Sequence, residues 1–205
     1  YSKNLNELYV SDASIKSIIS INIRTSYLEK ISDTFDNNPL NGPSDLVLTD
    51  EGNIIFTDPI RKPFPNPCIS PTYILDKDKK ISQLIPDLAF PSGIAYFEKK
   101  VFISETRANR LIALSTNTND EENNVEPELF RRFAEPGNPD GLTIDDEGDI
   151  YQTLPGIGAI AVINKQGEMT DIYHMDNWKP SNIHFNQGMF YVTDRLGSRI
   201  FQFSK

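Results

Sequence analysis

Short apolar runs alternate with turn-forming residues along most of the chain. Runs at 46–48, 54–57 and 110–115 are rich in leucine, isoleucine and phenylalanine, and glycine, aspartate or asparagine stands close to each. Such runs are typical of β-strands that are buried on both faces. Because no segment shows apolar residues at the 3.6-residue spacing of an amphipathic helix, the chain is predicted to be all-β.

The strand pattern repeats. Similar segments begin at Pro43 (PSDLVL), Pro91 (PSGIAY), Pro139 (PDGLTI) and Pro180 (PSNIHF), which are 48, 48 and 41 residues apart. A partial fifth copy, ELYVSD, covers Glu7–Asp12. A period near 45 residues with several short strands per unit is typical of propeller blades.

Each repeat is predicted to contain four strands. The strand after the proline is followed by second strands at 54–57, 101–104, 150–153 and 190–193, third strands at 110–115, 158–164 and 199–204, and fourth strands at 80–85 and 168–173. The turn sequence DEG, at Asp50–Gly52 and again at Asp146–Gly148, places glycine where a tight hairpin requires positive φ.

The length of 205 residues leaves the predicted ring incomplete. At roughly 40–45 residues per four-stranded blade, the chain holds fewer than five blades. We expect one propeller domain over 1–205, preceded by a missing N-terminal part, because an open ring would expose strand edges that soluble proteins avoid. The acidic segment Asn117–Glu128 is predicted to be a mobile loop.

Composition narrows the range of partners. The formal net charge of −9 argues against nucleic-acid binding, which needs clustered lysine and arginine, and no apolar run is long enough for a membrane helix. The single cysteine, Cys68, excludes an internal disulfide, and no histidine partner supports it as a nucleophile. The cellular compartment and the oligomeric state stay open.

The residues that follow the four prolines are the first candidates for chemistry. In a propeller the innermost strands line a central channel, so Ser44, Ser92, Asp140 and Ser181 are expected to form one ring. One carboxylate with hydroxyls and carbonyls could hold a hard cation such as Ca²⁺, which could polarise an ester carbonyl and stabilise the oxyanion. Serine or aspartate after proline is also ordinary turn and cap chemistry, and that alternative stands beside the first.

The segments PSDLVLTDEGNIIFTDP, FPSGIAYFEKKVFISETRANRLIAL and NPDGLTIDDEGDIYQTLPGIGAIAVINKQGEM resemble consecutive blades of the senescence marker protein / gluconolactonase family. The pairing of PSD with FTD, and of SET with ANRL, is most similar to its drug-responsive lactonase branch. The resemblance implies a six-bladed β-propeller that here lacks the first blade and part of the second, so that the chain supplies blades two to six. It also implies a calcium-dependent hydrolase of small-molecule lactones or related esters.

The family holds its metal through a first-blade glutamate, an asparagine of a PNG motif and an aspartate of a PDG motif. The resemblance therefore implies that Asp140 is the catalytic anion at the metal and that Ser92, in place of the asparagine, is a further ligand. Ser44, Asp45 and Ser181 are implied to line the substrate pocket. Nothing in the chain matches the first-blade glutamate.

The remaining polar candidates have structural interpretations. His174 and His184 lie in predicted strands, where a lone histidine is more often structural than a general base. Trp178 is expected near the channel entrance of the last blade, as an aromatic wall for a substrate or as plain packing.

Second strands end repeatedly in a carboxylate. Asp12, Asp58, Glu105 and Asp194 share this register, and repetition predicts that they cap turns by accepting backbone N–H bonds. Asp58, which precedes a proline-rich loop, has a second interpretation as part of a structural calcium site or of the channel mouth.

Two functions remain open from the sequence. The first is a metal-assisted lactone or ester hydrolase that uses Asp140. The second is a non-catalytic propeller whose serine-rich channel has lost its metal and which acts as a binding scaffold. The two functions differ in their affinity for a divalent cation.

Overall fold

The computed structural model describes residues 6–116 and 126–205, and nearly all of the described regular structure is β. The chain forms two compact units, Tyr1–Pro91 and Ser92–Lys205, and each is described by itself. Most of the acidic segment predicted as a loop, residues 117–125, lies outside the described residues, and Glu128 begins a strand. None of the helices described is long and apolar enough to cross a membrane.

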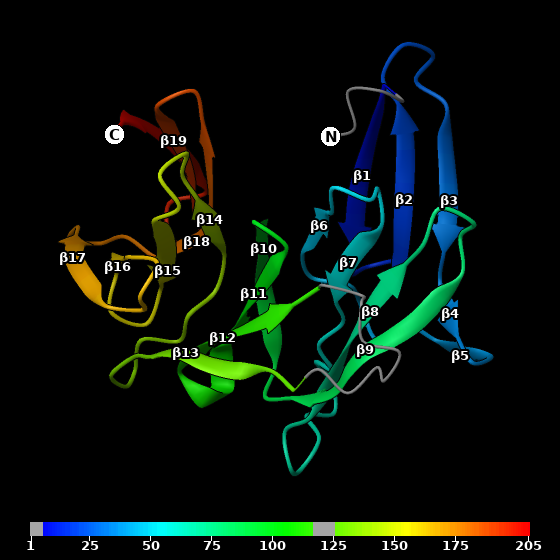
Figure 1. Ribbon diagram of the computed structural model, residues 1–205, viewed down its shortest axis with the longest axis horizontal. Coiled ribbons are helices and arrows are strands. Elements are labelled where there is room, and N and C mark those ends of the chain that lie inside the picture. The colour runs from blue at the N-terminus through cyan, green and yellow to red at the C-terminus, as the bar shows by residue number, and fades with distance from the viewer. Residues whose placement is uncertain (1–5, 117–125) are drawn as a thin grey trace. The chain divides into compact units, whose positions relative to one another are not determined.

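The first unit contains two larger antiparallel sheets and a small ladder (Figure 1). The three-stranded sheet consists of β1 (Glu7–Asp12), β2 (Ser17–Asn22) and β3 (Leu28–Ser32). The four-stranded sheet consists of β6 (Leu46–Leu48), β7 (Ile54–Thr57), β8 (Ser70–Leu75) and β9 (Ile81–Leu88). Between them lies the ladder of β4 (Thr34–Phe35) and β5 (Asn38–Pro39) in chain order.

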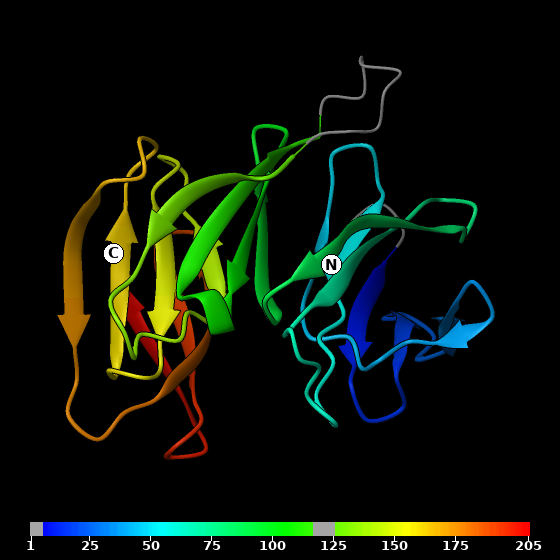
Figure 2. The same ribbon diagram turned by 90° about the horizontal axis from the view of Figure 1, so that it is seen from below.

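The second unit contains three antiparallel sheets, whose strands follow one another in chain order (Figure 2). The first consists of β10 (Pro91–Phe97), which begins at the unit boundary, β11 (Lys100–Glu105), β12 (Arg110–Ser115) and β13 (Glu128–Arg132). The second consists of β14 (Leu142–Ile144), β15 (Ile150–Leu154), β16 (Ala159–Ile163) and β17 (Met169–His174). The last consists of β18 (Pro180–Asn186), β19 (Met189–Asp194) and β20 (Arg199–Ser204). A single 3-10 turn, Thr106–Ala108, interrupts the described strands of this unit.

These sheets confirm the prediction of an all-β propeller, with five blade-like sheets in the described part of the chain. The prediction of a six-bladed ring in one domain stays a prediction. Strands at 17–22 and 28–32 were not predicted because they precede the first repeated proline motif. Strands at 70–75 and 128–132 were also not predicted, since a long polar or proline-rich segment precedes each of them. The strand at 70–75 begins inside the proline-rich segment 61–71, where pairing with β7 and β9 outweighs the low strand propensity of proline.

Apolar side chains from consecutive sheets meet in separate clusters. In the first unit the buried members are Ile18, Leu40, Ile54, Phe56, Tyr73 and Leu75. In the second unit one cluster contains Ala95, Phe102, Leu111, Ala113, Leu142, Ile150 and Ile163, and another contains Tyr151, Ile160, Val162, Trp178, Ile183, Phe190 and Val192. Successive residues of β15 and β16 therefore enter different clusters, as the two-residue alternation of a strand buried on both faces requires.

Both glycines of the DEG turns have the predicted backbone conformation. Gly52 has φ of 83° and Gly148 has φ of 88°. Only glycine adopts this region without steric cost, so the hairpin geometry requires it here.

Other glycines are needed where inner strands meet. A Cβ atom on Gly93 would lie 2.2 Å from the carbonyl oxygen of Asp140, and one on Gly141 would lie 2.6 Å from the Cα atom of Asn182. Both contacts are with backbone atoms, which cannot rotate away. The glycine after the motif residue thus allows the beginnings of three consecutive inner segments to touch.

We expect Gly141→Ala to lower the free energy of unfolding by about 2–3 kcal/mol, because the added methyl group overpacks a backbone contact. Gly188→Asn is the matched control: Gly188 has φ of 76° with nothing within 4 Å of its Cβ position, and asparagine tolerates this conformation, so the loss should stay below about 1 kcal/mol. Urea unfolding of both variants measures the difference. Equal stability of Gly141→Ala and the wild type would contradict the close approach.

Candidate active site

The predicted ring residues of the second unit lie next to one another. The backbone N–H of Gly141 donates to the carbonyl oxygen of Ser181 at 2.9 Å, and Gly93 abuts the carbonyl of Asp140. The residues after Pro91, Pro139 and Pro180 therefore begin three adjacent inner segments. The structure brings Ser92, Asp140 and Ser181 to the same end of their sheets.

Asp140 supplies the carboxylate of this group. Its backbone N–H donates to the carbonyl of Thr153 at 3.1 Å, which fixes its position at the start of the sheet. Its Oδ2 accepts a hydrogen bond from Nη2 of Arg195 at 2.5 Å. The Asp140 side chain is 21% exposed and that of Arg195 is 64% exposed. Solvent can therefore reach the Asp140 carboxylate. Its partner, Arg195, is a long side chain at the surface.

Ser92 is buried, with 3% of its surface exposed. Its Oγ lies 2.7 Å from Oγ1 of Thr106 and donates to the carbonyl oxygen of Pro139 at 3.3 Å. The Thr106 hydroxyl also donates to that carbonyl, at 2.8 Å. The hydroxyl of Ser92 therefore ties its strand to the segment that carries Asp140.

Ser181 is partly exposed, and its Oγ lies 2.9 Å from Oγ1 of Thr193. Its carbonyl accepts hydrogen bonds from Gly141 and, at 3.4 Å, from the Thr153 hydroxyl. The side chain of Ser181 thus belongs to its own sheet, whereas its backbone joins the neighbouring one.

Ser44 and Asp45 occupy the equivalent positions in the first unit. The Ser44 N–H donates to the carbonyl of Thr57 at 2.9 Å, and Ser11 Oγ donates to the carbonyl of Ser44, also at 2.9 Å. The Asp45 carboxylate accepts the N–H of Leu46 at 2.9 Å. Because both residues belong to the other unit, their place in a common substrate pocket stays a prediction.

A row of hydroxyls that sequence reasoning missed joins neighbouring sheets. A hydroxyl residue stands at or next to the end of each second strand: Ser11, Thr57, Ser104, Thr153 and Thr193. Three of them reach the next sheet: Ser11 to Ser44, Thr153 to Ser181, and Ser104 to the Gln152 side chain at 2.8 Å. The sequence could have revealed this row, because serine or threonine stands directly before the carboxylate or leucine that follows it at the same position of every repeat.

Asp12, Asp58 and Asp194 accept backbone N–H bonds as predicted. Asp12 accepts from Ser14 at 2.8 Å and Asp58 accepts from Gly42 at 2.7 Å. Asp194 accepts from Lys179, Leu196 and Gly197, at 2.9, 3.1 and 3.0 Å. Glu105 pairs with the guanidinium of Arg110. Asp58, Glu105 and Asp194 are buried, whereas Asp12 is partly exposed.

The environments of two of these carboxylates shift their pKa values in opposite directions. Burial raises the pKa of Asp58, although N–H groups of Asn41 and Gly42 oppose the rise. The N–H of Lys179 holds the pKa of Asp194 below its usual range, with help from Arg199. The capping contacts account for Asp58, and its second interpretation as a calcium ligand stays untested.

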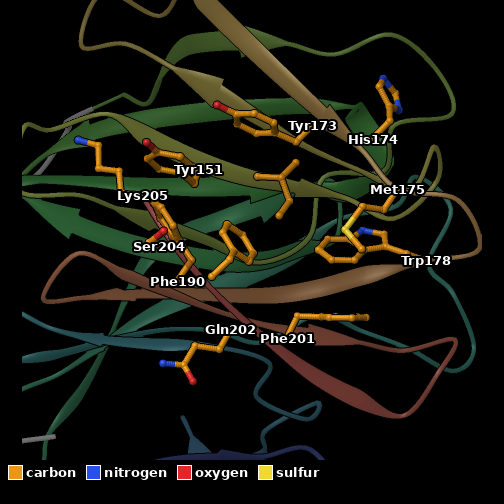
Figure 3. Close-up of a pocket in the computed structure, with 12 residues that line it drawn as sticks. Tyr151, Tyr173, His174, Met175, Trp178, Phe190, Phe201, Gln202, Ser204 and Lys205 are labelled. Carbon is orange, nitrogen blue, oxygen red and sulfur yellow. The ribbon is translucent and has the colours of Figure 1, made fainter.

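Trp178 is 5% exposed and packs against Phe201, with ring centroids 5.1 Å apart, in the cluster between the last two sheets. It also lines a pocket of about 510 Å³ among the described residues (Figure 3). Packing between sheets is thus observed for this residue, and its place at a channel entrance stays a prediction. His184 lies on β18 opposite Tyr191, and His174 ends β17.

An acidic cluster in the turn between β14 and β15 was not predicted. Carboxylate oxygens of Asp145, Glu147 and Asp149 lie within 4.8 Å of one another. Lys205 Nζ lies 2.8 Å from both Asp145 Oδ2 and Glu147 Oε2. Although burial opposes it, the Lys205 contact and two backbone N–H groups lower the pKa of Asp145. The Lys205 ammonium group thus supplies a positive charge to the acidic cluster.

The inner segments that meet at Asp140 carry one carboxylate and the hydroxyls of Ser92 and Ser181, whose described partners include Thr106, the Pro139 carbonyl and Thr193. Carboxylate, hydroxyl and carbonyl oxygens are the hard donors that Ca²⁺ prefers, and the ion takes six to eight of them. These residues therefore fit such a cation in the kind of donor that they offer.

Comparison with known proteins adds independent information. Residues 3–199 match the family model described as the SMP-30/Gluconolactonase/LRE-like region. The lactonase drp35 of Staphylococcus aureus is 29% identical over 130 residues, which cover 60% of this chain and 39% of that protein. The chain thus spans about two fifths of the length of the curated relatives it matches.

Solved structures show the same fold. A gluconolactonase from Xanthomonas campestris superposes with a TM-score of 0.76 at 21% identity, over 92% of this chain and 65% of that one. Regucalcin, a calcium-binding protein from Agrobacterium tumefaciens, gives a TM-score of 0.76 at 18% identity, over 92% and 64% of the two chains. At these identities the likeness concerns the fold.

We expect Lys205→Met to lower the free energy of unfolding at pH 7 by about 1 kcal/mol, because it removes an ion pair that is partly open to solvent. The folded-state pKa of Asp145 is lowered, so this stabilisation is present above the ordinary pKa of the carboxyl and is lost as the pH falls through the lowered value. Urea unfolding at pH 7 and pH 3 measures the difference in unfolding free energy between the wild type and Lys205→Met, which should be smaller at pH 3. Lys179→Met, at an exposed position, is the control. A difference between the wild type and Lys205→Met that is the same at both pH values would contradict the ion pair.

Proposed function

Since the chain belongs to the SMP-30/Gluconolactonase/LRE-like family, we propose that it forms part of a hydrolase that opens lactones or related carboxylic esters. The name of its relative in Staphylococcus aureus, a lactonase, supports this substrate class. The observation that carries the proposal is the position of Asp140: a partly exposed carboxylate where three consecutive inner segments meet. A family aspartate in the PDG motif stands at this place.

We further propose that the hydrolase uses Ca²⁺ or another divalent cation. Asp140 would hold the ion as the principal anion, and Ser92, whose hydroxyl now bonds the Pro139 carbonyl, is the proposed further ligand. A cation bound there would polarise the ester carbonyl and stabilise the oxyanion that develops on attack. Additional oxygen donors would complete the site.

The surrounding residues have specific tasks in this proposal. Thr153 and Gly141 fix the backbone on both sides of Asp140, so that the carboxylate holds its position without rearrangement. Arg195 neutralises Asp140 and must turn outward before the carboxylate binds a cation, which its 64% exposure permits. Ser44, Asp45 and Ser181 are proposed to contact the substrate.

Finer features of the family extend the proposal. We propose that the complete ring contains six blades and that the chain provides five of them. The PSD–FTD and SET–ANRL pairings support a place in the drug-responsive lactonase branch.

One observation favours a second function, a non-catalytic scaffold. The Arg195 guanidinium occupies Asp140 Oδ2, which is where a cation would bind. If the ion pair persists in solution, the positive charge of arginine replaces that of the metal. The two functions then differ in cation affinity and in hydrolysis, which can be measured separately.

We expect calorimetric titration with Ca²⁺ to show one site, and Asp140→Asn to weaken it roughly 100-fold or more, because a carboxylate ligand is lost. Arg195→Gln removes the competing cation, and we expect two- to fivefold tighter binding, as for a surface ion pair of up to about 1 kcal/mol. If neither substitution changed the Ca²⁺ affinity, the cation would bind at a site other than Asp140. Absence of binding in the wild type would favour the scaffold.

We expect the protein to hydrolyse small lactones with a rate that depends on the added cation, and Asp140→Asn to reduce kcat/KM roughly 100- to 1000-fold, as when a transition-state charge loses its stabiliser. Release of acid from a panel of lactones and aryl esters, followed at constant pH, measures the rate. Asp171→Asn, in an exposed strand, is the matched control and should leave the rate unchanged. Cation binding without any hydrolysis would contradict the proposed hydrolase but would still support the metal site.

A further inference from the structure

The sheet that carries Asp140 has a buried amide where the repeat otherwise has an apolar side chain. One position before the hydroxyl residue, the second strands β7, β11, β15 and β19 carry Phe56, Ile103, Gln152 and Val192. The inner strand is apolar opposite this position, with Leu46, Leu142 and Ile183 facing Phe56, Gln152 and Val192. All four second-strand residues are 0% exposed. Gln152 is therefore a polar exception at a core position.

Packing alone does not account for this exception. An amide that leaves water for an apolar interior is unfavourable unless hydrogen bonds replace those to water. An apolar side chain of similar size would fill the same space without that requirement, as it does in the neighbouring sheets. The glutamine occurs in the sheet whose inner segment begins with Asp140, so its contacts with that segment are the place to look for its role.

The amide of Gln152 contacts the backbone of the Asp140 segment directly. Its Nε2 donates to the carbonyl oxygens of Asp140, Gly141 and Thr153, at 3.2, 3.1 and 3.1 Å. The Ser104 hydroxyl, from the preceding sheet, donates to its Oε1 at 2.8 Å. Carbonyl oxygens only accept hydrogen bonds, so the NH₂ end of the amide must face them. The chemistry of the neighbours thus fixes the orientation of the amide.

Two of the three carbonyls have other donors. The Gly141 carbonyl also accepts the backbone N–H of Thr153 at 3.0 Å and its hydroxyl at 2.8 Å, and the Thr153 carbonyl accepts the N–H of Asp140 at 3.1 Å. The specific contribution of Gln152 is therefore its bond to the Asp140 carbonyl. Together with the bond from the Asp140 N–H, it holds the peptide groups on both sides of the Asp140 Cα atom. The carboxylate keeps only the rotations of its own side chain.

We propose that Gln152 is a positioning residue for Asp140. Its amide holds the Asp140 backbone, and Ser104 holds the amide, so that the carboxylate has its place before a cation or a substrate arrives. Gln152 is fully buried and acts through Asp140. The inference rests on the proposed function, in which Asp140 is the principal anion at the metal. Residues that orient a metal ligand are needed for full affinity and activity, because a small displacement of the ligand weakens both.

A purely structural pin between two sheets is the alternative, because the Ser104 bond joins β11 to β15. The two roles predict different measurements. Loss of a structural pin lowers the free energy of unfolding and leaves the Ca²⁺ affinity of the folded protein unchanged. Loss of a positioning residue changes Ca²⁺ affinity and kcat in a protein that is still folded.

The central variant is Gln152→Met, which keeps the length of the side chain and removes both ends of the amide. We expect Ca²⁺ affinity in calorimetry to fall roughly 10-fold, and kcat for a lactone at saturating cation also to fall roughly 10-fold, with KM changed less than about twofold. Ile103→Met is the matched control, since it alters the same register of β11 without the loss of a hydrogen-bonding side chain. It should leave affinity and kcat near the wild-type values.

Hydrogen exchange tests the contact without any cation or substrate. In Gln152→Met we expect the backbone amide protons of Asp140 and Gly141 to exchange roughly 10-fold faster than in the wild type, because the segment is less firmly held. The amide of Asp145, which bonds the Asp149 carbonyl in the turn between β14 and β15, is the internal control and should not change. A uniform increase at all three amides would indicate a structural pin and overturn the proposal.

Ser104→Ala tests the path to Asp140 and carries the test if circular dichroism shows that Gln152→Met is unfolded. Without the hydroxyl the amide is less firmly oriented, so we expect a change in the same direction, about two- to fivefold in Ca²⁺ affinity. Because Ser104 acts through Gln152, its substitution should have no further effect in the Gln152→Met background. Additive effects of the two substitutions would overturn this path.

Failure of the inference and failure of the proposed function give different results. Wild-type Ca²⁺ affinity, kcat and exchange rates in Gln152→Met would overturn the inference and leave the hydrolase intact. A wild-type protein that neither binds Ca²⁺ nor hydrolyses lactones would contradict the proposed function, whereas faster exchange confined to Asp140 and Gly141 would still support the hold of Gln152 on Asp140.

Discussion

Packing of short sheets against one another within each unit is the constraint on which the rest of the structure depends. Strands of three to eight residues have too little surface to be stable alone. Residues of β16 therefore divide between two clusters, with Ala159, Ala161 and Ile163 on one face and Ile160 and Val162 on the other. The sheet of β14–β17 thus has partners on both sides, and alanines of β16 lie where the partner contributes a ring, Phe133.

The same constraint positions the candidate chemistry. Because inner segments touch at Gly93 and Gly141, the residues before these glycines, Ser92 and Asp140, are held against the next segment. The buried hydroxyls of Ser104 and Thr153 then connect one sheet to the next through side-chain and carbonyl acceptors. The result is a rigid support for a single carboxylate, with Arg195 as its exposed counter-ion. Precise placement of this kind is what a metal-assisted hydrolase requires, and it would equally stabilise a scaffold.

Much of the fold could be predicted because the same strand pattern occurs several times along the chain. The strands at 54–57, 110–115 and 199–204 were found with their bounds, since each follows a proline motif or a DEG turn at constant spacing. β2 and β3 were missed because they precede the first proline motif. The role of Trp178 could not be assigned, because channel wall and inter-sheet packing use the same residue type at the same point of the chain.

The sequence by itself determined the all-β repeat, the positive-φ glycines and the alignment of Ser92, Asp140 and Ser181, because these depend on local spacing and on backbone sterics. Tertiary structure decided which partner each polar group meets. Arg195 lies 55 residues from Asp140 along the chain and Lys205 lies 58 residues from Glu147, so no local pattern could reveal either pair. It also decided that rings from two sheets, among them Tyr151 and Phe201, line one pocket. Such features arise from the packing of whole sheets, which brings distant segments together only after the local strands have formed.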